Sequence, residues 1–302
     1  MRERRVGRSG LVVSVVGLGT NNFGWRLDEE RAVAVVHAAV DAGLTFFDTA
    51  EMYGDGASER FLGRALAGRR EEVVIATKFG WERETDPPGG SAANVRRAIE
   101  GSLERLRTEY VDLYQYHRPD GVTPLEETLG ALEELVEAGK VRHIGSSNFS
   151  AAEVRAAGEV AREQGVSAFV SAQNRYSLVD REAEAELVPA LEELGLGLIP
   201  YYPLANGLLT GKYRRGEPAP DGTRLASRGL SVEGATWDRV EALEEFAGAR
   251  GLTLLDVAVG GLAAMPAVSS VIAGATSPEQ VRANAAAGEW VPSADELAEL
   301  RG

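Results

Sequence analysis

Four side chains from separate parts of the sequence could together transfer a proton: Asp48, Tyr53, Lys78 and His117. A free tyrosine has a pKa of about 10, so it donates a proton near pH 7 only if its anion is stabilised. A nearby lysine ammonium can stabilise that anion, and a buried lysine needs a carboxylate partner. We therefore predict an ion pair between Lys78 and Asp48. Tyr53 would then donate its proton to an oxygen of the substrate, and His117 would hydrogen-bond that same oxygen.

Each of these four residues, taken alone, has an ordinary structural explanation. A single tyrosine is usually a packing residue, a lysine is usually a solvated charge, and a histidine is usually structural. The combination favours chemistry because Asp48, Lys78 and His117 each fall at the end of a different predicted strand, with Tyr53 shortly after the first of them. These strands were predicted from apolar runs, independently of the four residues.

Runs rich in β-branched and aliphatic residues alternate with helical patterns along the chain. The runs predict strands near 14–19, 44–48, 73–77, 111–116, 142–146, 168–173, 196–201 and 268–273. The helical patterns cover 29–42, 59–67, 91–107, 124–138, 150–164, 182–194, 236–250 and 253–264, with a last helix starting near Pro278. Asp28 and Ser58 are predicted helix caps, and Ser150 with Glu153 resembles a capping box.

Eight strands, each followed by a helix, predict an α/β fold of the (β/α)8 TIM-barrel type. An N-terminal hairpin should precede it, and extra loops and helices should follow strand 7, because residues 202–267 exceed one strand–helix unit and begin with a loop over 205–235. The main alternative is an open doubly wound sheet. In a barrel, functional residues lie at the C-terminal strand ends, and Asn148, Gln173 and Tyr201 also fall there.

Composition excludes several classes of function. The formal charge of −14 disfavours nucleic acid as a partner. There is no cysteine, so disulfides are excluded. No apolar run is long enough for a membrane span, and the N-terminal apolar run lacks a convincing cleavage site. We expect one cytoplasmic domain over residues 1–302.

Other catalytic patterns are missing from the sequence. Gly17 and Gly19 are followed by Asn22, so the third glycine of a dinucleotide-binding fingerprint is absent. No tyrosine has a lysine four residues later, and no Gly-x-Ser-x-Gly elbow occurs. The spacing of the three histidines, His37, His117 and His143, predicts no metal site.

The chain resembles the aldo-keto reductase superfamily from about Gly17 to Asn284. The strings that carry the resemblance are GLGT (17–20), FDTAEMYG (47–54), ATKFG (76–80), DLYQYHRPD (112–120), IGSSNF (144–149), AQNRYSL (172–178), YYPLANGLLTGKY (201–213) and GATSPEQVRAN (274–284). The family's catalytic tetrad maps onto Asp48, Tyr53, Lys78 and His117 without substitution. The resemblance implies hydride transfer from a nicotinamide cofactor to an aldehyde or ketone.

The resemblance also implies that the cofactor lies extended across the barrel mouth. Ser147, Asn148 and Gln173 would bind the carboxamide, whose planar amide suits their donors and acceptors, and Tyr201 would stack on the nicotinamide. Asp48 is a further implied cofactor contact. The others are Gly19, Thr20 and Asn21 on the ribose side, and Pro203, Leu204, Gly207 and Lys212 at the pyrophosphate.

The adenine end departs from the best-known family pattern. Gly274, Ala275 and Gln280 stand where that pattern has a lysine, a serine and an arginine around the 2′-phosphate. The remaining candidates for phosphate contacts are Thr276, Ser277, Gln280 and Arg282, and Asn284 should lie near the adenine. Because similar segments occur in family branches that use NADPH, NADP(H) is favoured, with NAD(H) as the alternative.

The substrate is expected to be a small carbonyl compound, and Trp25 and Trp81 are the candidate aromatic walls of its pocket. Arg118 could bind a polar substrate or form a salt bridge. Aldehydes, ketones, sugars and quinones all remain open, as does the reverse reaction of an NAD-dependent sugar or alcohol dehydrogenase. A cofactor-binding regulatory protein resembling potassium-channel β-subunits is a second class. Oligomeric state cannot be predicted from this sequence.

Overall fold

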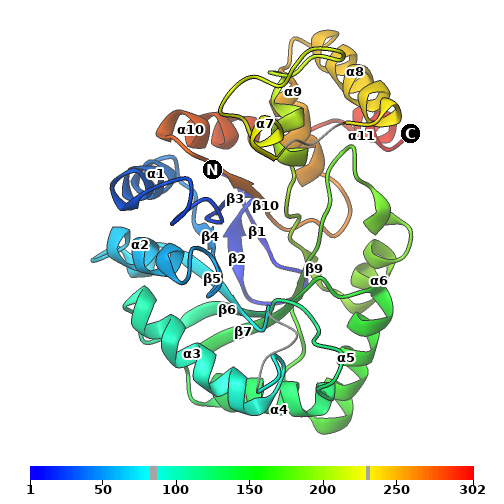
Figure 1. Cartoon of the computed structure of the whole chain (residues 1–302). Helices are drawn as coiled ribbons and strands as arrows, with labels where there is room; N and C mark the ends of the chain where they lie inside the picture. The colour runs from blue at the N-terminus through cyan, green and yellow to red at the C-terminus, as the bar shows by residue number, and fades with distance from the viewer. Residues whose placement is uncertain (82–86, 229–231) are drawn as a thin grey trace.

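Eight parallel strands surround a central axis, with helices on the outside, in the computed structural model of the chain (Figure 1). The structure describes residues 1–81, 87–228 and 232–302. The strands are adjacent in the order β10 (Val271–Gly274), β3 (Val16–Gly19), β4 (Phe46–Asp48), β5 (Val74–Phe79), β6 (Val111–Tyr116), β7 (Val141–Ser147), β8 (Ser171–Gln173) and β9 (Gly197–Leu198). This arrangement confirms the predicted (β/α)8 barrel.

The last strand of this order, the short β9, meets the segment that leads into the first strand, β10. The Leu198 amide donates to the Ala267 carbonyl at 2.7 Å, and the Ser269 amide donates to the Leu198 carbonyl at 2.8 Å. These bonds form a parallel bridge between Leu198 and Val268, just before β10. The sheet therefore closes, which rules out the open doubly wound alternative.

A hairpin packs under the barrel as the sequence predicted. It consists of β1 (Glu3–Arg5) paired antiparallel with β2 (Val12–Ser14). Apolar residues of the hairpin form one buried cluster with inward-facing strand residues: Val6, Leu11, Val13, Phe46, Ala76, Leu113, Ile199 and Ile272. The barrel interior is thus filled at its N-terminal end.

Strand periodicity then determines which side chains reach the open end. Successive side chains of a strand point to opposite faces, so residues two apart share a face. Phe46 and Ala76 point into the barrel, and therefore Asp48 and Lys78 point inwards one step nearer the C-terminal end. His117 follows the inward-facing Leu113 by four residues, which is two strand repeats, so it continues the same inward face.

The helices largely follow the predicted pattern and cover the outside of the barrel. They are α1 (Glu29–Asp41), α2 (Ala57–Ala65), α3 (Ala92–Leu106), α4 (Leu125–Glu137), α5 (Ala151–Gln164), α6 (Leu187–Leu194), α10 (Pro278–Ala287) and α11 (Ala294–Arg301), with short 3₁₀ turns η1 (Arg70–Glu72) and η2 (Glu182–Glu184). Asp28 caps α1, and the capping box of Ser150 and Glu153 is present. The 182–194 pattern forms η2 and α6 instead of one continuous helix.

The prediction that Ser58 caps a helix is wrong. Helix α2 begins at Ala57, two residues before the predicted start at 59. Gly56, which has a positive φ of 74°, precedes its first residue. The Ser58 hydroxyl lies inside the helix and contacts the Thr20 hydroxyl at 2.7 Å and the Thr49 hydroxyl at 2.9 Å. Its side chain therefore ties α2 to the ends of β3 and β4.

The interval between β9 and β10 carries the predicted extra structure. It contains η3 (Ala205–Thr210), α7 (Arg224–Arg228), α8 (Gly234–Gly248), α9 (Leu254–Asp256) and a π-helical turn, η4 (Val257–Gly261). Residues 229–231 of the predicted 205–235 loop lie outside the described residues. Within the described ranges, no helix is both long and apolar enough to cross a membrane.

Candidate active site

A buried ion pair lies at the C-terminal end of the barrel. Lys78 Nζ donates to Asp48 Oδ2 at 2.7 Å and to the Thr49 carbonyl at 2.8 Å. Lys78 is 0% exposed and Asp48 is 2% exposed. The Gln173 amide donates to the other Asp48 oxygen at 2.8 Å. Because both charges have partners, the cost of burying each is offset within the protein.

Tyr53 lies beside this pair, in the turn after β4. Lys78 Nζ is 5.2 Å from the centre of the Tyr53 ring. The ring also meets His117 edge to face, with 6.0 Å between the ring centroids and 82° between the planes. The structure therefore brings together all four residues of the predicted tetrad, which come from β4, the turn after it, β5 and the end of β6.

The electrostatic state of Tyr53 differs from the sequence-based expectation. Burial, followed by the charge of Asp48, raises the pKa of Tyr53 well above its usual value of 10.0. Lys78 was expected to lower the pKa of Tyr53, but its positive charge is paired with the carboxylate of Asp48. Burial also lowers the pKa of Lys78, against the opposing effect of Asp48. A tyrosine with a raised pKa keeps its proton at neutral pH.

His117 is neutral in the same environment. Burial, and then the charge of Lys78, lower its pKa well below 6.5. Its backbone amide donates to the Phe79 carbonyl at 2.8 Å, and the Trp81 ring lies 4.7 Å from the imidazole between centroids. Its buried Nδ1 has no hydrogen-bond partner among the described residues. A neutral imidazole offers one N–H donor and one acceptor nitrogen.

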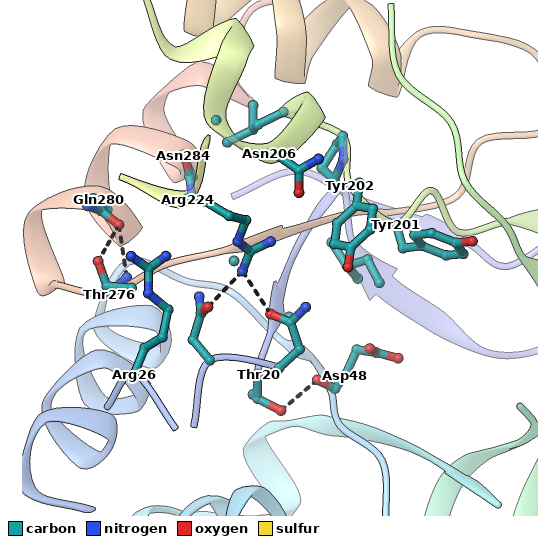
Figure 2. A pocket seen from close by; sticks show the side chains of 18 of the residues that line it. Thr20, Arg26, Asp48, Tyr201, Tyr202, Asn206, Arg224, Thr276, Gln280 and Asn284 are labelled. Carbon is teal, nitrogen blue, oxygen red and sulfur yellow. Dashed lines mark hydrogen bonds between the residues drawn. The ribbon is translucent and has the colours of Figure 1, made fainter. Parts of the chain in front are cut away.

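A cavity of about 680 Å³ lies across the barrel mouth and is lined by Tyr53 and His117 among others. Figure 2 shows other lining residues, from Asp48 to Gln280. Trp81 lines the cavity as well, whereas Lys78 lies beneath it, out of the lining. Most of the residues predicted to contact a cofactor line this cavity, whereas Ser277 and Arg282 do not: Gly19, Thr20, Asn21, Asp48, Ser147, Asn148, Gln173, Tyr201, Pro203, Leu204, Gly207, Lys212, Gly274, Thr276, Gln280 and Asn284 are in the lining. Residues separated by more than 200 positions therefore share one surface.

Hydrogen bonds fix the polar wall next to His117. The Asn148 amide nitrogen donates to the His117 carbonyl at 3.0 Å, and the Tyr201 hydroxyl donates to Asn148 Oδ1 at 2.8 Å. The Ser147 hydroxyl donates to the Gln173 carbonyl at 2.9 Å. Asn148 has a positive φ of 58°, a conformation that asparagine tolerates better than most residues. These bonds fix the orientation of the polar groups in the wall.

Several features of the cavity suit an anionic dinucleotide. Three cationic side chains, Arg26, Lys212 and Arg224, line it, although the chain carries a net charge of −14. The buried Asn206 Oδ1, also in the lining, has no hydrogen-bond partner among the described residues. The phosphates of a long polar ligand would pair with the cations, since charge-assisted bonds to phosphate are strong, and a hydroxyl or amino group of such a ligand could donate to Asn206 Oδ1.

The two arginines of this cavity were not identified from the sequence. Arg224 donates to Asn22 Oδ1 at 2.7 Å, and Arg26 donates to the Gly222 carbonyl at 2.8 Å. The contacts hold the segment around 221–224 against the loop after β3 (Figure 2). The sequence identified 205–235 as a long arginine-rich loop, but periodicity cannot indicate which arginine of an irregular loop faces a cavity.

Tyr202 was also missed, and it lines the cavity beside Tyr201. The two rings meet edge to face, with 5.3 Å between their centroids. Tyr202 has a positive φ of 55°, unusual for a bulky residue. No sequence pattern indicates such a conformation.

Other candidates from the sequence lie outside the cavity. Trp25 is 54% exposed, donates its indole N–H to the Asn21 carbonyl and is not part of the lining, so the cavity gives no support to its assignment as a substrate wall. Arg282 is also outside the lining, and it pairs with Glu279 at 2.9 Å. The guanidinium carbon of Arg118 lies 5.5 Å from the centre of the Trp81 ring, and within the described residues Arg118 forms no salt bridge.

The described residues contain no cluster of histidine, aspartate or glutamate side chains suited to a metal ion.

Comparisons with known proteins agree with these observations. The family model described as "Aldo/keto reductase family" matches residues 15–302. The chain is 37% identical to a probable voltage-gated potassium channel subunit beta of Oryza sativa subsp. japonica, covering 97% of this chain and 92% of the relative. It is 39% identical to the uncharacterized oxidoreductase YrpG of Bacillus subtilis (strain 168), covering 93% and 89% respectively. The chain therefore belongs to the aldo/keto reductase family.

Proposed function

We propose that this protein is an NADP(H)-dependent oxidoreductase that reduces a small aldehyde or ketone to an alcohol. The observation that carries the proposal is the meeting of protonated Tyr53, neutral His117 and the buried Lys78–Asp48 pair at one end of the cavity. The bound reduced dinucleotide would supply the hydride.

The residues of the chain have distinct roles in this proposal. Tyr53 gives its proton to the carbonyl oxygen as negative charge develops there. The raised pKa of Tyr53 disfavours loss of its proton in the resting state. The new alkoxide can still take this proton because it is strongly basic, and the ammonium of Lys78, 5.2 Å from the Tyr53 ring, stabilises the negative charge left behind. His117 positions the same oxygen with its single N–H. Asp48 holds Lys78 in place and keeps it charged.

The cavity would bind the dinucleotide through groups already in position. Ser147, Asn148 and Gln173 would hold the carboxamide, while Tyr201 would stack on the ring. Lys212 and the backbone around Gly207 would meet the pyrophosphate, which suits a lysine and backbone N–H groups. The presence of three cations in an acidic protein supports NADP(H) over NAD(H), since the former carries one more phosphate.

A second candidate function comes from the relatives described as potassium channel β-subunits, one from rice and one, 34% identical, from Arabidopsis thaliana. In this alternative the protein would bind the cofactor as a regulatory subunit and turn over slowly. The two candidates share the cavity, so cofactor binding cannot separate them. The rate of carbonyl reduction can.

The test is a fluorescence titration with NADPH and NADH, followed by an absorbance assay at 340 nm with a panel of aldehydes and ketones. Tight NADPH binding with turnover is expected. Binding without turnover on any panel member would favour the regulatory alternative. If neither nucleotide binds, the proposal fails.

A further inference from the structure

The three cations of the cavity differ in what they contact. Arg224 is held by the side chains of Asn22 and Asn21, next to the end of β3. Lys212 is exposed and follows Gly207, near the segment proposed for the pyrophosphate. Arg26 comes from the loop between β3 and α1, and Figure 2 shows its side chain pointing towards the end of the cavity where Thr276 and Gln280 lie.

Most of the hydrogen-bonding capacity of Arg26 is unused by its protein contacts. A guanidinium has five N–H donors, and among the described residues the Arg26 side chain forms one hydrogen bond, to the Gly222 carbonyl. Within the described residues, no carboxylate forms an ion pair with Arg26. Its guanidinium carbon lies 5.4 Å from the centre of the Trp25 ring, which orients the group. The exposed Trp25 thus supports a cation instead of lining the cavity.

The cavity end that Arg26 faces offers no other cation from its own segment. Gly274, Thr276 and Gln280 line it and are uncharged. The Gln280 side-chain oxygen accepts from the Thr276 amide at 2.8 Å, so the group that this side chain can offer to a phosphate is its uncharged NH2. The one arginine of this segment, Arg282, pairs with Glu279 outside the lining. A dianion placed there would need a positive charge from elsewhere.

We propose that Arg26 binds the 2′-phosphate of the adenosine ribose and makes the site selective for NADP(H) over NAD(H). This inference rests on the proposed function, since it assigns a specificity-determining residue to the same cofactor. A phosphate monoester carries a charge of about −1.5 to −2 at pH 7, and arginine can bind it with two parallel N–H bonds. The charge that the 274–284 segment lacks is thereby supplied from the β3–α1 loop.

The test uses direct binding, without turnover. Dissociation constants of NADPH and NADH are measured by fluorescence, and those of 2′,5′-ADP and 5′-ADP by calorimetry, for the native protein, Arg26→Gln and Arg26→Lys. Arg282→Gln is the matched control, because it removes the same type of side chain close to the same segment. Circular dichroism checks that each variant is folded.

Loss of a charge-assisted bond of about 1.5–3 kcal/mol should weaken binding by roughly 10- to 100-fold. We expect Arg26→Gln to weaken NADPH and 2′,5′-ADP to this extent, with NADH and 5′-ADP changed by less than about threefold. Arg26→Lys should retain part of the preference, and Arg282→Gln should retain all of it.

Two results would overturn the assignment while leaving the proposed function intact. Equal weakening of NADPH and NADH would mean that Arg26 acts only by holding Gly222, and unchanged NADPH binding would mean that it contacts no phosphate. Native protein that binds neither nucleotide would instead refute the proposed function itself.

Discussion

The two ends of the cavity satisfy their charges in different ways. At the tetrad end, Lys78 and Asp48 are 0% and 2% exposed, and each is bonded to the other. At the opposite end, Lys212 is exposed and Arg26 bonds one backbone carbonyl. The buried charges of the first end are paired with each other, because unpaired charges cannot be buried cheaply. The second end is accessible to water and can leave positive charge for a ligand to neutralise.

The largest effect is expected from Tyr53→Phe, which removes the proposed proton donor and no charge. Carbonyl reduction should fall by roughly 10²- to 10⁴-fold, as is typical for loss of a general acid. The dissociation constant of NADPH should stay within about twofold, since the ring remains. The assay is kcat at 340 nm together with the fluorescence titration.

Tyr202→Phe is the matched control for that substitution, because it removes a second hydroxyl from the same cavity. It should keep most of the activity. If the two variants lost activity equally, or if Tyr53→Phe lost cofactor binding as well, the proton-donor role would have to be abandoned.

Lys78→Met should reveal the cost of an unpaired charge at the buried end. Removal of one partner of a buried ion pair typically costs about 3–5 kcal/mol in the free energy of unfolding, because the other charge stays buried. Urea unfolding measures this loss, and adding Asp48→Asn should restore part of it. Activity should be lost in both variants.

The comparison for Lys78→Met is Arg96→Met at the surface. Arg96 pairs with Glu134 at 2.7 Å, but these side chains are 52% and 54% exposed. Exposed pairs contribute about 0–1 kcal/mol, since water already solvates both charges. Similar destabilisation by the two substitutions would contradict the contrast drawn between buried and exposed charge.

Acid should weaken the loop beside the tetrad. Burial of Asp120 opposes its ionisation, but hydrogen bonds from Thr123, Gly90 and Val122 outweigh that effect and lower its pKa from 3.8 to about 2. Because the unfolded chain takes up the proton first, stability present above pH 3.8 should be lost as the pH falls towards 2. The expected loss is on the order of 2 kcal/mol.

Chemical denaturation at a series of pH values measures this slope. Asp120→Asn should be less stable at neutral pH and should show a flatter dependence between about pH 4 and pH 2. A variant with the same slope as the native protein would show that another carboxylate is responsible.

The smallest effect is expected at the exposed end, from Lys212→Gln. If Lys212 meets the pyrophosphate, NADPH and NADH should weaken alike, by roughly three- to tenfold. The effect should shrink as salt is added, because exposed charges are screened. Titrations at low and high salt measure it, and a loss confined to NADPH would place Lys212 at the 2′-phosphate instead.

The sequence predicted the buried end better than the exposed one, for a physical reason. Asp48, Lys78 and His117 lie on regular strands, where two-residue periodicity and barrel geometry place side chains at the mouth. The loops have no such periodicity. Trp25 was therefore assigned to a substrate wall that it does not line, and Arg26 was overlooked.

Two further differences have the same origin. Ser58 has the residue type and position of a helix cap, but contacts with Thr20 and Thr49 compete for its hydroxyl. The expected lowering of the Tyr53 pKa was derived from the charge of Lys78 alone. Only the three-dimensional structure shows how completely burial and Asp48 offset it.

The hairpin of β1 and β2 has a consequence for how ligands reach the site. Its apolar residues fill the barrel from the N-terminal end, so the strand ends can be reached only from the side of the cavity mouth. Two ligands that meet beside Tyr53 would therefore both approach from this one face of the barrel.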